Sequence, residues 1–283
     1  MPQTISVFVI NLDRRTDRRD RIASHLEERG VAWRRVAAYD AAAASEAELA
    51  RTIAGRGPLG PLGFGDRACT VSHTLAWETF LQTEAAGYAL FLEDDIYLGS
   101  DIAATVASDA WIPSGTDAVK LEKYNSGASR LLLGPVVGQT PGGRKLRPMR
   151  SRHVGGGAYI LSRRGAENAL EWRGRMRVPV DHFLFNDTVS PVMKRLRPLI
   201  VVPAMATQRK YAYDSDTSSY TKAAKYKGWR RHLQSLMRGR AELNQVPRQV
   251  FELATRRARI VEVSFQEEPS AGGPQAGRSD EIP

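Results

Sequence analysis

Short apolar runs alternate along the chain with stretches whose apolar residues recur at helical spacing. Residues 4–12 are apolar and β-branched, which predicts a buried strand. Residues 14–29 carry Ile22 and Leu26 one helical turn apart, which predicts a helix with one inner face. The same patterns predict strands at 31–37, 88–92, 118–122 and 154–162, and helices at 41–50, 69–85 and 165–172. This alternation favours an α/β fold with a central, mostly parallel sheet.

The last quarter of the chain has a different pattern and a different charge. Residues 222–259 hold 11 basic and 2 acidic side chains, whereas residues 1–221 hold 29 and 24. Apolar residues recur there at near-helical spacing among arginines: Leu233, Leu236, Leu243, Val246, Val250 and Ala254. We therefore predict a domain at 1–221, a basic amphipathic helical extension at 222–265 and a disordered tail, rich in Pro, Gly, Ser and acids, at 266–283. The localised charge makes nucleic acid an unexpected partner for the domain.

Composition excludes several classes of protein. A single cysteine, Cys69, rules out a disulfide framework and a zinc site built from several thiolates. The five histidines lack the spacing of a metalloprotease, and no Gly-x-Ser-x-Gly elbow is present. No run approaches 18 apolar residues, and the first apolar run is too short for a signal peptide. We expect a cytoplasmic protein.

Three acids, Glu93, Asp94 and Asp95, follow the predicted strand at 88–92. Ligands of open α/β sheets bind beyond the carboxyl ends of strands, so these side chains are expected to face a crevice. Mg²⁺ and Mn²⁺ prefer carboxylate and phosphate oxygens, which makes a metal bridging a diphosphate one interpretation. A solvated acidic turn is the other.

The carboxylate of Asp181, apart from the three acids above, is suited to acid–base chemistry. Asp181 lies among Val178, Val180 and Phe183, and a carboxylate in apolar surroundings can take a proton from an acceptor hydroxyl. An N-cap of the following helix would explain the same residue.

Six segments together resemble glycosyltransferase family 25, the lipooligosaccharide-type β-galactosyltransferases, which include the collagen galactosyltransferase domain. They are VFVINLDRRTDRR, RVAAYDA, ACTVSHTLAWETFL, ALFLEDDI, GGGAYILSRRGAENAL and PVDHFLF, and the resemblance as a whole covers roughly residues 4 to 210. The resemblance implies a GT-A-like single nucleotide-sugar-binding domain, a UDP-sugar donor, a divalent cation (Mn²⁺ or Mg²⁺) and inversion at the anomeric carbon.

The resemblance also implies roles for individual residues. Asp95 would be the direct metal ligand, with Glu93 beside it and Gln208 completing the metal or phosphate shell. Asp181 would be the base. The donor would contact a larger set: Asn11, Leu12, Arg15 and Arg18 at the nucleotide, Asp40 at the uracil or ribose, Ser72 and His73 in shaping the site, Asp94 within the acidic motif, and Gly156 and Gly157 where the backbone approaches the sugar. A solvated helix face for the arginines and a core position for His73 are the structural alternatives.

The predicted activity is therefore inverting transfer of a hexose, galactose or glucose, from a UDP-sugar to a hydroxyl of a glycan such as lipooligosaccharide or lipopolysaccharide core. A non-catalytic nucleotide-sugar or glycan-binding protein of the same fold is the alternative, and a basic surface-binding module is a third. Residues 222–259 could lie on an anionic membrane surface, peripheral to the inner membrane, or dock on the domain or on a second subunit of a homo-oligomer.

Overall fold

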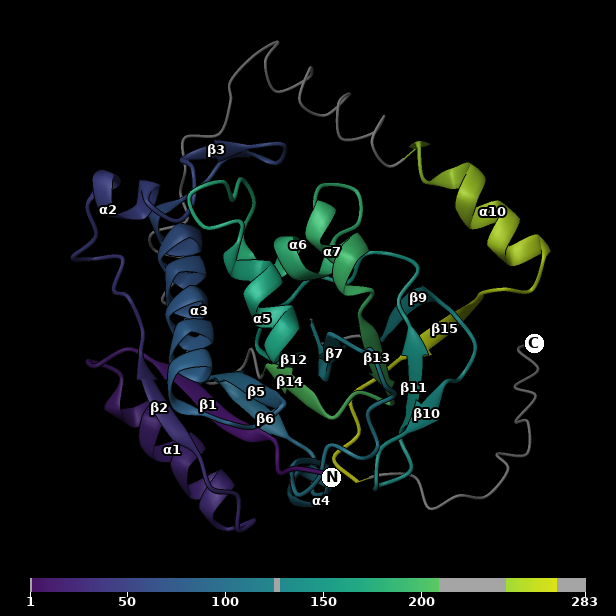
Figure 1. The fold of residues 1–283 in the computed structure, drawn as a ribbon, viewed down its shortest axis with the longest axis horizontal. Helices are drawn as coiled ribbons and strands as arrows, with labels where there is room; N and C mark the ends of the chain where they lie inside the picture. Colours follow the sequence, from purple (N-terminus) through teal and green to yellow (C-terminus); the bar gives the residue numbers. More distant parts are fainter. Residues whose placement is uncertain (1, 125–127, 209–242, 269–283) are drawn as a thin grey trace, which may run out of the picture.

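The computed structural model describes residues 2–124, 128–208 and 243–268 and has one large sheet at its centre (Figure 1). Eight strands form it, in the order β10 (Gly138–Gln139), β11 (Lys145–Pro148), β13 (Leu199–Val202), β7 (Ala118–Lys120), β12 (Ala158–Ser162), β5 (Tyr88–Glu93), β1 (Ser6–Asn11) and β2 (Arg34–Ala37). A three-stranded sheet contains β6 (Ile96–Leu98), β14 (Ala206–Gln208) and β8 (Glu122–Lys123), in that order. Two further sheets have two strands each: β15 (Arg259–Val263) pairs with β9 (Ser129–Leu133), and β3 (Arg56–Gly57) pairs with β4 (Gly60–Pro61).

Helices cover both faces of the large sheet because its inner strands are apolar on both sides. In β1, Phe8 packs in the cluster that contains Trp77, whereas Val9 packs in the opposite cluster with Leu26. The first face carries α3 (Phe64–Thr83), α5 (Arg163–Leu170), α6 (Val180–Phe185) and α7 (Pro191–Leu196), and the second carries α1 (Thr16–Glu27) and α4 (Ile102–Val106). A short helix, α2 (Glu46–Ala50), precedes α3 and begins with a capping box at Ser45.

The predicted α/β class is confirmed, but the mostly parallel sheet is not. Strand β12 runs antiparallel to both β5 and β7, and β10, β11 and β13 also pair antiparallel. Only β1–β2, β1–β5 and β13–β7 are parallel pairs in the large sheet. The reason is the connection: no helix lies between β7 and β12 in the described part of the chain, and parallel strands need a long crossover, usually helical. The sheet is therefore mixed.

The C-terminal extension is only partly helical where the structure describes it. Helix α10 (Val246–Ala254) matches the predicted helical spacing, but residues 259–263 form the strand β15, which pairs with β9 and fully buries Val263. The chain then returns to the domain, where the Ser264 carbonyl accepts a hydrogen bond from the Ala204 amide at 2.9 Å. Residues 222–242 and 269–283 lie outside the described residues. The extension thus docks on the domain through a strand that helical periodicity does not reveal.

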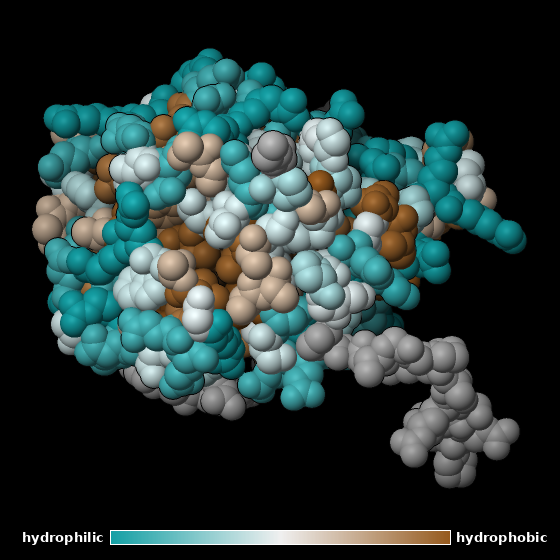
Figure 2. All heavy atoms as spheres, turned by 60° about the horizontal axis from the view of Figure 1, so that its bottom comes forward, coloured by the Kyte–Doolittle hydropathy of each residue, from teal (hydrophilic) through white to brown (hydrophobic). Residues whose placement is uncertain are grey.

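The surface of the protein has both apolar and hydrophilic regions. Figure 2 shows one face, on which apolar side chains gather in a hollow surrounded by a hydrophilic rim. Helix α10 has no buried residue, and its Val250 and Phe251 are more than half exposed. None of the helices in the described ranges is both long and apolar enough to cross a membrane. Contact of residues 222–259 with a membrane surface stays a prediction.

Candidate functional site

The acidic segment lies where two neighbouring parallel strands end. The register of β1 on β5 pairs Ile10 with Glu93, so the residues that follow both strands emerge at the same edge of the sheet. Arg15 and Thr16 then open α1 directly after β1. Carboxyl ends of parallel strands are where open α/β sheets bind ligands, and the predicted acids occupy this position.

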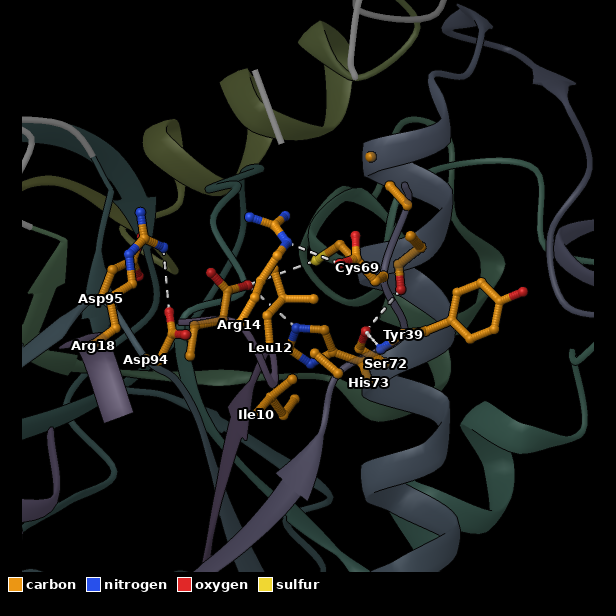
Figure 3. Close-up of a pocket in the computed structure, with 16 residues that line it drawn as sticks. Ile10, Leu12, Arg14, Arg18, Tyr39, Cys69, Ser72, His73, Asp94 and Asp95 are labelled. Atoms are coloured by element: carbon orange, nitrogen blue, oxygen red, sulfur yellow. Dashed lines mark hydrogen bonds and ion pairs between the residues drawn. The ribbon is translucent and has the colours of Figure 1, made fainter. Parts of the chain in front are cut away.

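A cavity opens at this edge (Figure 3). Cys69, Ser72 and His73 point into it from α3, and Asp94 and Asp95 lie on the opposite side. Its remaining lining comes from the strand ends, the loop after β2, and helices α1 and α3: Ile10, Leu12, Arg14, Arg18, Ala38, Tyr39, Asp40, Ala41, Gly65, Ala68 and Glu93. The structure therefore brings together eight residues predicted from the sequence: Leu12, Arg18, Asp40, Ser72, His73, Glu93, Asp94 and Asp95.

A chain of buried hydrogen bonds ends on Glu93. The Trp77 indole donates to the Tyr159 hydroxyl at 2.9 Å, and that hydroxyl lies 2.7 Å from Nδ1 of His73. Since the hydroxyl oxygen accepts from Trp77, its proton is available to Nδ1, which leaves the imidazole proton on Nε2. Nε2 then donates to Oε1 of Glu93 at 3.2 Å. His73 is fully buried, and burial lowers its pKa to about 4, so the neutral imidazole orients Glu93.

Two further donors hold the Glu93 carboxylate. The Gln208 amide donates to Oε2 at 3.0 Å, and the Cys69 thiol donates to Oε1 across 3.8 Å. Gln208 reaches this place because β14 pairs with β6, which sets it opposite Ile96. Gln208 thus lies beside the acidic segment, and its role in completing a metal or phosphate shell stays a prediction. Burial, then the charges of Asp94 and Asp181, raise the pKa of Glu93 to about 7.

Asp94 is buried and engaged by neighbouring side chains. Asn11 donates to its Oδ2 at 2.7 Å, and Arg18 donates to its Oδ1 at 3.3 Å. Arg21 donates to its carbonyl oxygen at 2.6 Å. Asp94 therefore ties the end of β5 to α1 and to the end of β1. Asn11 is not among the residues that line the cavity.

Asp95 differs from its neighbours in that one of its oxygens is unpartnered. Oδ1 is buried and has no hydrogen-bond partner among the described residues, and Oδ2 lies 3.9 Å from the Arg18 guanidinium. Burial, then the charges of Glu93 and Asp94, raise the pKa of Asp95 to about 7. A buried carboxylate oxygen without a donor is costly, and a hard cation would satisfy it.

The opposite wall carries cationic and polar groups. Arg14 donates to Asp40 at 2.8 Å, and the Arg14 guanidinium lowers the pKa of that carboxyl. Ser72 accepts a hydrogen bond from the Tyr39 amide at 2.8 Å and donates to the Ala68 carbonyl, which fixes the loop after β2 against α3. Arg15, predicted at the nucleotide, is instead paired with Asp17 outside the cavity lining.

Asp181 lies in a second cavity, beyond the first turn of α3. It is the second residue of α6, whose N-cap is Pro179, so the alternative that Asp181 is the N-cap is wrong. Its Oδ1 accepts from the His182 amide at 2.7 Å and its Oδ2 from the Gly155 amide at 3.3 Å. The cavity is lined by Leu59, Pro61, Leu62, Asp66, Arg152, Pro179, Asp181, His182, Thr188 and Val189. Burial, then the charge of Asp181, raise the pKa of Asp66 to about 6.

The glycines at 155–157 separate the two groups of acids. Gly155 has φ +99°, a conformation that favours glycine, and an added Cβ would lie 2.8 Å from Cβ of Tyr124. A Cβ on Gly157 would lie 2.4 Å from Cδ1 of Ile96 and 3.2 Å from the Gln208 amide. The glycines therefore allow the backbone to pass between Asp181 on one side and the Glu93 cluster on the other.

Sequence reasoning missed a buried ion pair beneath these glycines. Lys120 and Glu122 are both fully buried, 3.6 Å apart, on consecutive short strands. Lys120 donates to the Gly155 carbonyl, and Glu122 accepts from the Gly157 amide at 2.8 Å. Two charged residues inside the apolar run 118–122 are the only sequence signal, and periodicity treats them as a strand. Together they fix the glycine backbone.

The comparison with family models identifies the class of protein as a glycosyltransferase. The match is to glycosyltransferase family 25 (LPS biosynthesis protein) and covers residues 4–184, more than half of the chain. The chain belongs to glycosyltransferase family 25, as the sequence resemblance predicts.

Several curated proteins are similar over part of their length. The lacto-N-neotetraose biosynthesis glycosyltransferase LgtB of Neisseria gonorrhoeae is 29% identical over 168 residues, 58% of this chain and 59% of the relative. LgtB of Neisseria meningitidis serogroup B is 26% identical over 185 residues, 63% of this chain and 67% of the relative. LgtE of Neisseria gonorrhoeae, with the same descriptive name, is 26% identical over 55% of this chain and 56% of its own. The chain spans little more than half the length of the first and the third of these relatives.

A further similarity is to a solved structure. It is a glycosyltransferase involved in the glycosylation of the major capsid of PBCV-1, with 10% sequence identity and a TM-score of 0.41 over 76% of this chain and 96% of that chain.

Proposed function

We propose that this chain is a metal-dependent, inverting hexosyltransferase that moves a sugar from a UDP-sugar to a hydroxyl of a lipooligosaccharide or lipopolysaccharide glycan. Family membership supports glycosyl transfer, and the names of the Neisseria relatives support a glycan of that kind as acceptor. Galactose is the donor sugar that the family resemblance favours. A GT-A-like domain, with donor and metal bound at the strand ends, is part of the same proposal.

The observation that carries the proposal is the unpartnered oxygen of Asp95 in the cavity at the ends of β1 and β5. A carboxylate oxygen in this state fits a hard cation, so Asp95 is the expected direct ligand, while Glu93 and Gln208 are already bonded to one another. When bound, the cation would supply charge stabilisation for the departing diphosphate. Arg14 and Arg18 on the cavity wall add positive charge where the phosphates would lie.

Asp181 is the proposed base. Its backbone donors at Gly155 and His182 hold the carboxylate in place at the lining of the second cavity, which is the space available for an acceptor sugar. The Asp181 carboxylate takes the proton from the acceptor hydroxyl, and the hydroxyl oxygen attacks the anomeric carbon of the donor sugar. The bond from that carbon to the diphosphate oxygen then breaks. A single displacement of this kind inverts the anomeric configuration.

The acceptor cavity has one apolar and one polar side. Leu59, Pro61 and Leu62 provide an apolar wall from the β3–β4 hairpin, and Asp66 and Arg152 provide polar groups. Sugars present apolar C–H faces and hydroxyl edges, so this lining suits a hexose acceptor. The hairpin is the segment that we expect to set acceptor preference.

The test combines binding and turnover. UDP is titrated calorimetrically into the full chain with Mn²⁺, with Mg²⁺ and with chelator, and UDP-sugars are then assayed for transfer to lactose-type and glucose-type acceptors. We expect cation-dependent binding that Asp95→Asn removes, and transfer that Asp181→Asn lowers by about 10²–10⁴-fold without loss of UDP affinity. Asp20→Asn, which changes a surface acid paired with Arg19, is the control.

Three other outcomes would contradict parts of the proposed function. Cation-independent UDP binding would contradict the role given to Asp95. UDP binding with no transfer or hydrolysis of any UDP-sugar would identify the chain as a nucleotide-sugar-binding member of the family. Loss of UDP binding in Asp181→Asn would make Asp181 a donor ligand instead of the base.

A further inference from the structure

Three different metal-ligand side chains converge on one point of the first cavity. Cys69 and His73 lie one turn apart on α3, and Glu93 faces them from the end of β5. Their sulfur, nitrogen and oxygen atoms all lie within 4.8 Å of one another. All three residues line the cavity, so the point where they meet is reached from the cavity. Figure 3 shows Cys69 and His73 pointing into it from α3.

The two separations that involve Glu93 match those of a tetrahedral centre. Zinc bonds of about 2.0–2.3 Å at tetrahedral angles place nitrogen and oxygen ligands about 3.3 Å apart, and sulfur and oxygen ligands about 3.6 Å apart. The observed separations are 3.2 Å from His73 Nε2 to Glu93 Oε1 and 3.8 Å from Cys69 Sγ to the same oxygen. Three protein ligands with the fourth position open to a cavity is the pattern of a zinc site that keeps a place for an exogenous ligand.

The surroundings also suit a bound cation. Ligating histidines usually donate their second ring N–H to an oxygen, and Nδ1 of His73 lies 2.7 Å from the Tyr159 hydroxyl, which Trp77 fixes in turn. A thiolate and a carboxylate balance the two charges of a divalent ion. Neutralising Glu93 in this way removes its repulsion with Asp94 and Asp95.

We infer that Cys69, His73 and Glu93 form a binding site for a thiophilic divalent cation such as Zn²⁺, distinct from the hard-cation position at Asp95. On binding, the Cys69 thiol releases its proton to solvent and its sulfur bonds to the metal. The imidazole proton moves to Nδ1, where it donates to Tyr159, so that Nε2 becomes the ligand atom. No redox change is involved.

A cation at this position lies at the wall of the proposed donor cavity. It would reduce the space beside Ser72 and add positive charge near Asp95. We therefore expect Zn²⁺ to weaken Mn²⁺-dependent UDP binding, which would make the site inhibitory. The metal site itself does not depend on the proposed transferase activity.

Cobalt provides a specific probe because Cys69 is the only cysteine in the chain. Co²⁺ bound by a thiolate gives a near-ultraviolet charge-transfer band, and in this protein such a band can come only from Cys69. We expect the band in the wild-type chain, its displacement by Zn²⁺, and its loss in Cys69→Ser with a more than about tenfold weaker Zn²⁺ affinity. Asp95→Asn is the matched control and should keep the band.

A second measurement, on the wild-type chain, tests the site even if Cys69→Ser fails to fold. Zn²⁺, but not Mg²⁺, should slow alkylation of Cys69 in the wild-type chain. Absence of the cobalt band, unchanged Zn²⁺ affinity in folded Cys69→Ser, or alkylation unaffected by Zn²⁺ would overturn the inference. Loss of the band in Asp95→Asn would also overturn it, because the thiophilic and hard cations would then share one site. Failure of UDP to bind would contradict only the proposed function.

Discussion

Replacing Asp95 by Asn should stabilise the protein at pH 8 when no divalent cation is present. The Asp95 carboxylate lies beside Glu93 and Asp94, and its Oδ1 is buried with no hydrogen-bond partner among the described residues. Its pKa is about 7 in the folded protein, against 3.8 when unperturbed. The folded state therefore binds more protons than the unfolded state between these values, so stability falls as the pH rises through this window. Asn carries no charge and avoids that loss.

The magnitude follows from the shift in pKa. A change from 3.8 to about 7 corresponds to about 4 kcal/mol at 1.36 kcal/mol per unit. The Asp95 side chain is 25% exposed and shares the repulsion with Glu93, so solvent screening and coupling reduce the expected gain to about 1–2 kcal/mol. For a chain of this size, that gain raises the melting temperature by about 2–8 °C.

Thermal unfolding in chelator at pH 5 and at pH 8 measures the effect. The gain from Asp95→Asn should be largest at pH 8 and shrink toward pH 5, and Mn²⁺ with UDP should reverse the order by stabilising only the wild-type chain. Asp20→Asn should change neither value. A metal-free Asp95→Asn protein that melts at or below the wild-type temperature at pH 8 would refute the reasoning.

Three further changes test other parts of the site. Gly155→Ala should impair folding and transfer, because φ is +99° and the new Cβ would lie 2.8 Å from a neighbouring side-chain carbon. A Cβ at Gly156 meets nothing closer than 3.6 Å, so Gly156→Ala should melt like wild type and serves as the control for folding. Lys120→Met should destabilise the protein by about 3–5 kcal/mol in urea unfolding, because it leaves a buried carboxylate uncompensated. Cation-dependent UDP binding should weaken as the pH falls below about 7, because protons then compete for Asp95 and Glu93; calorimetry that finds equal affinity at pH 6 and pH 8 would contradict this.

The acidic segment could be predicted from the sequence because its placement is a local property. An apolar strand that ends in three acids puts them at a strand end whatever the rest of the fold does. The direction of β12 could not be predicted in this way. Hydrophobic patterning shows that residues 158–162 are buried but not whether they run with or against β5, which depends on the absence of a helical crossover after β7.

Hydrophobic patterning does not reveal the partners of the site residues, because they are distant in sequence, and only the family resemblance pointed to Gln208. Gln208 reaches Glu93 across 115 residues, and Gly157 reaches Glu122 across 35. Strand β15 shows the same limit, because its apolar residues 260, 261 and 263 follow a helical stretch and only the pairing with β9 identifies them as a strand. Register and pairing, which local patterns do not encode, decide which side chains meet.

The carboxylates on either side of the glycines at 155–157 give a physical reason to expect a cation at Asp95. Burial, and then the charges of nearby carboxylates, raise the pKa of Glu93, Asp95 and Glu122, whereas the Lys120 ammonium lowers the pKa of Glu93 and of Glu122. Folding alone gains nothing from burying so many like charges, and an oxygen of Asp95 and one of Glu122 remain without hydrogen-bond partners among the described residues. A divalent cation would relieve both the repulsion and the unpartnered oxygen of Asp95. The metal-free protein is therefore expected to carry a destabilisation that ligand binding removes, which links the stability of Asp95→Asn directly to the proposed chemistry.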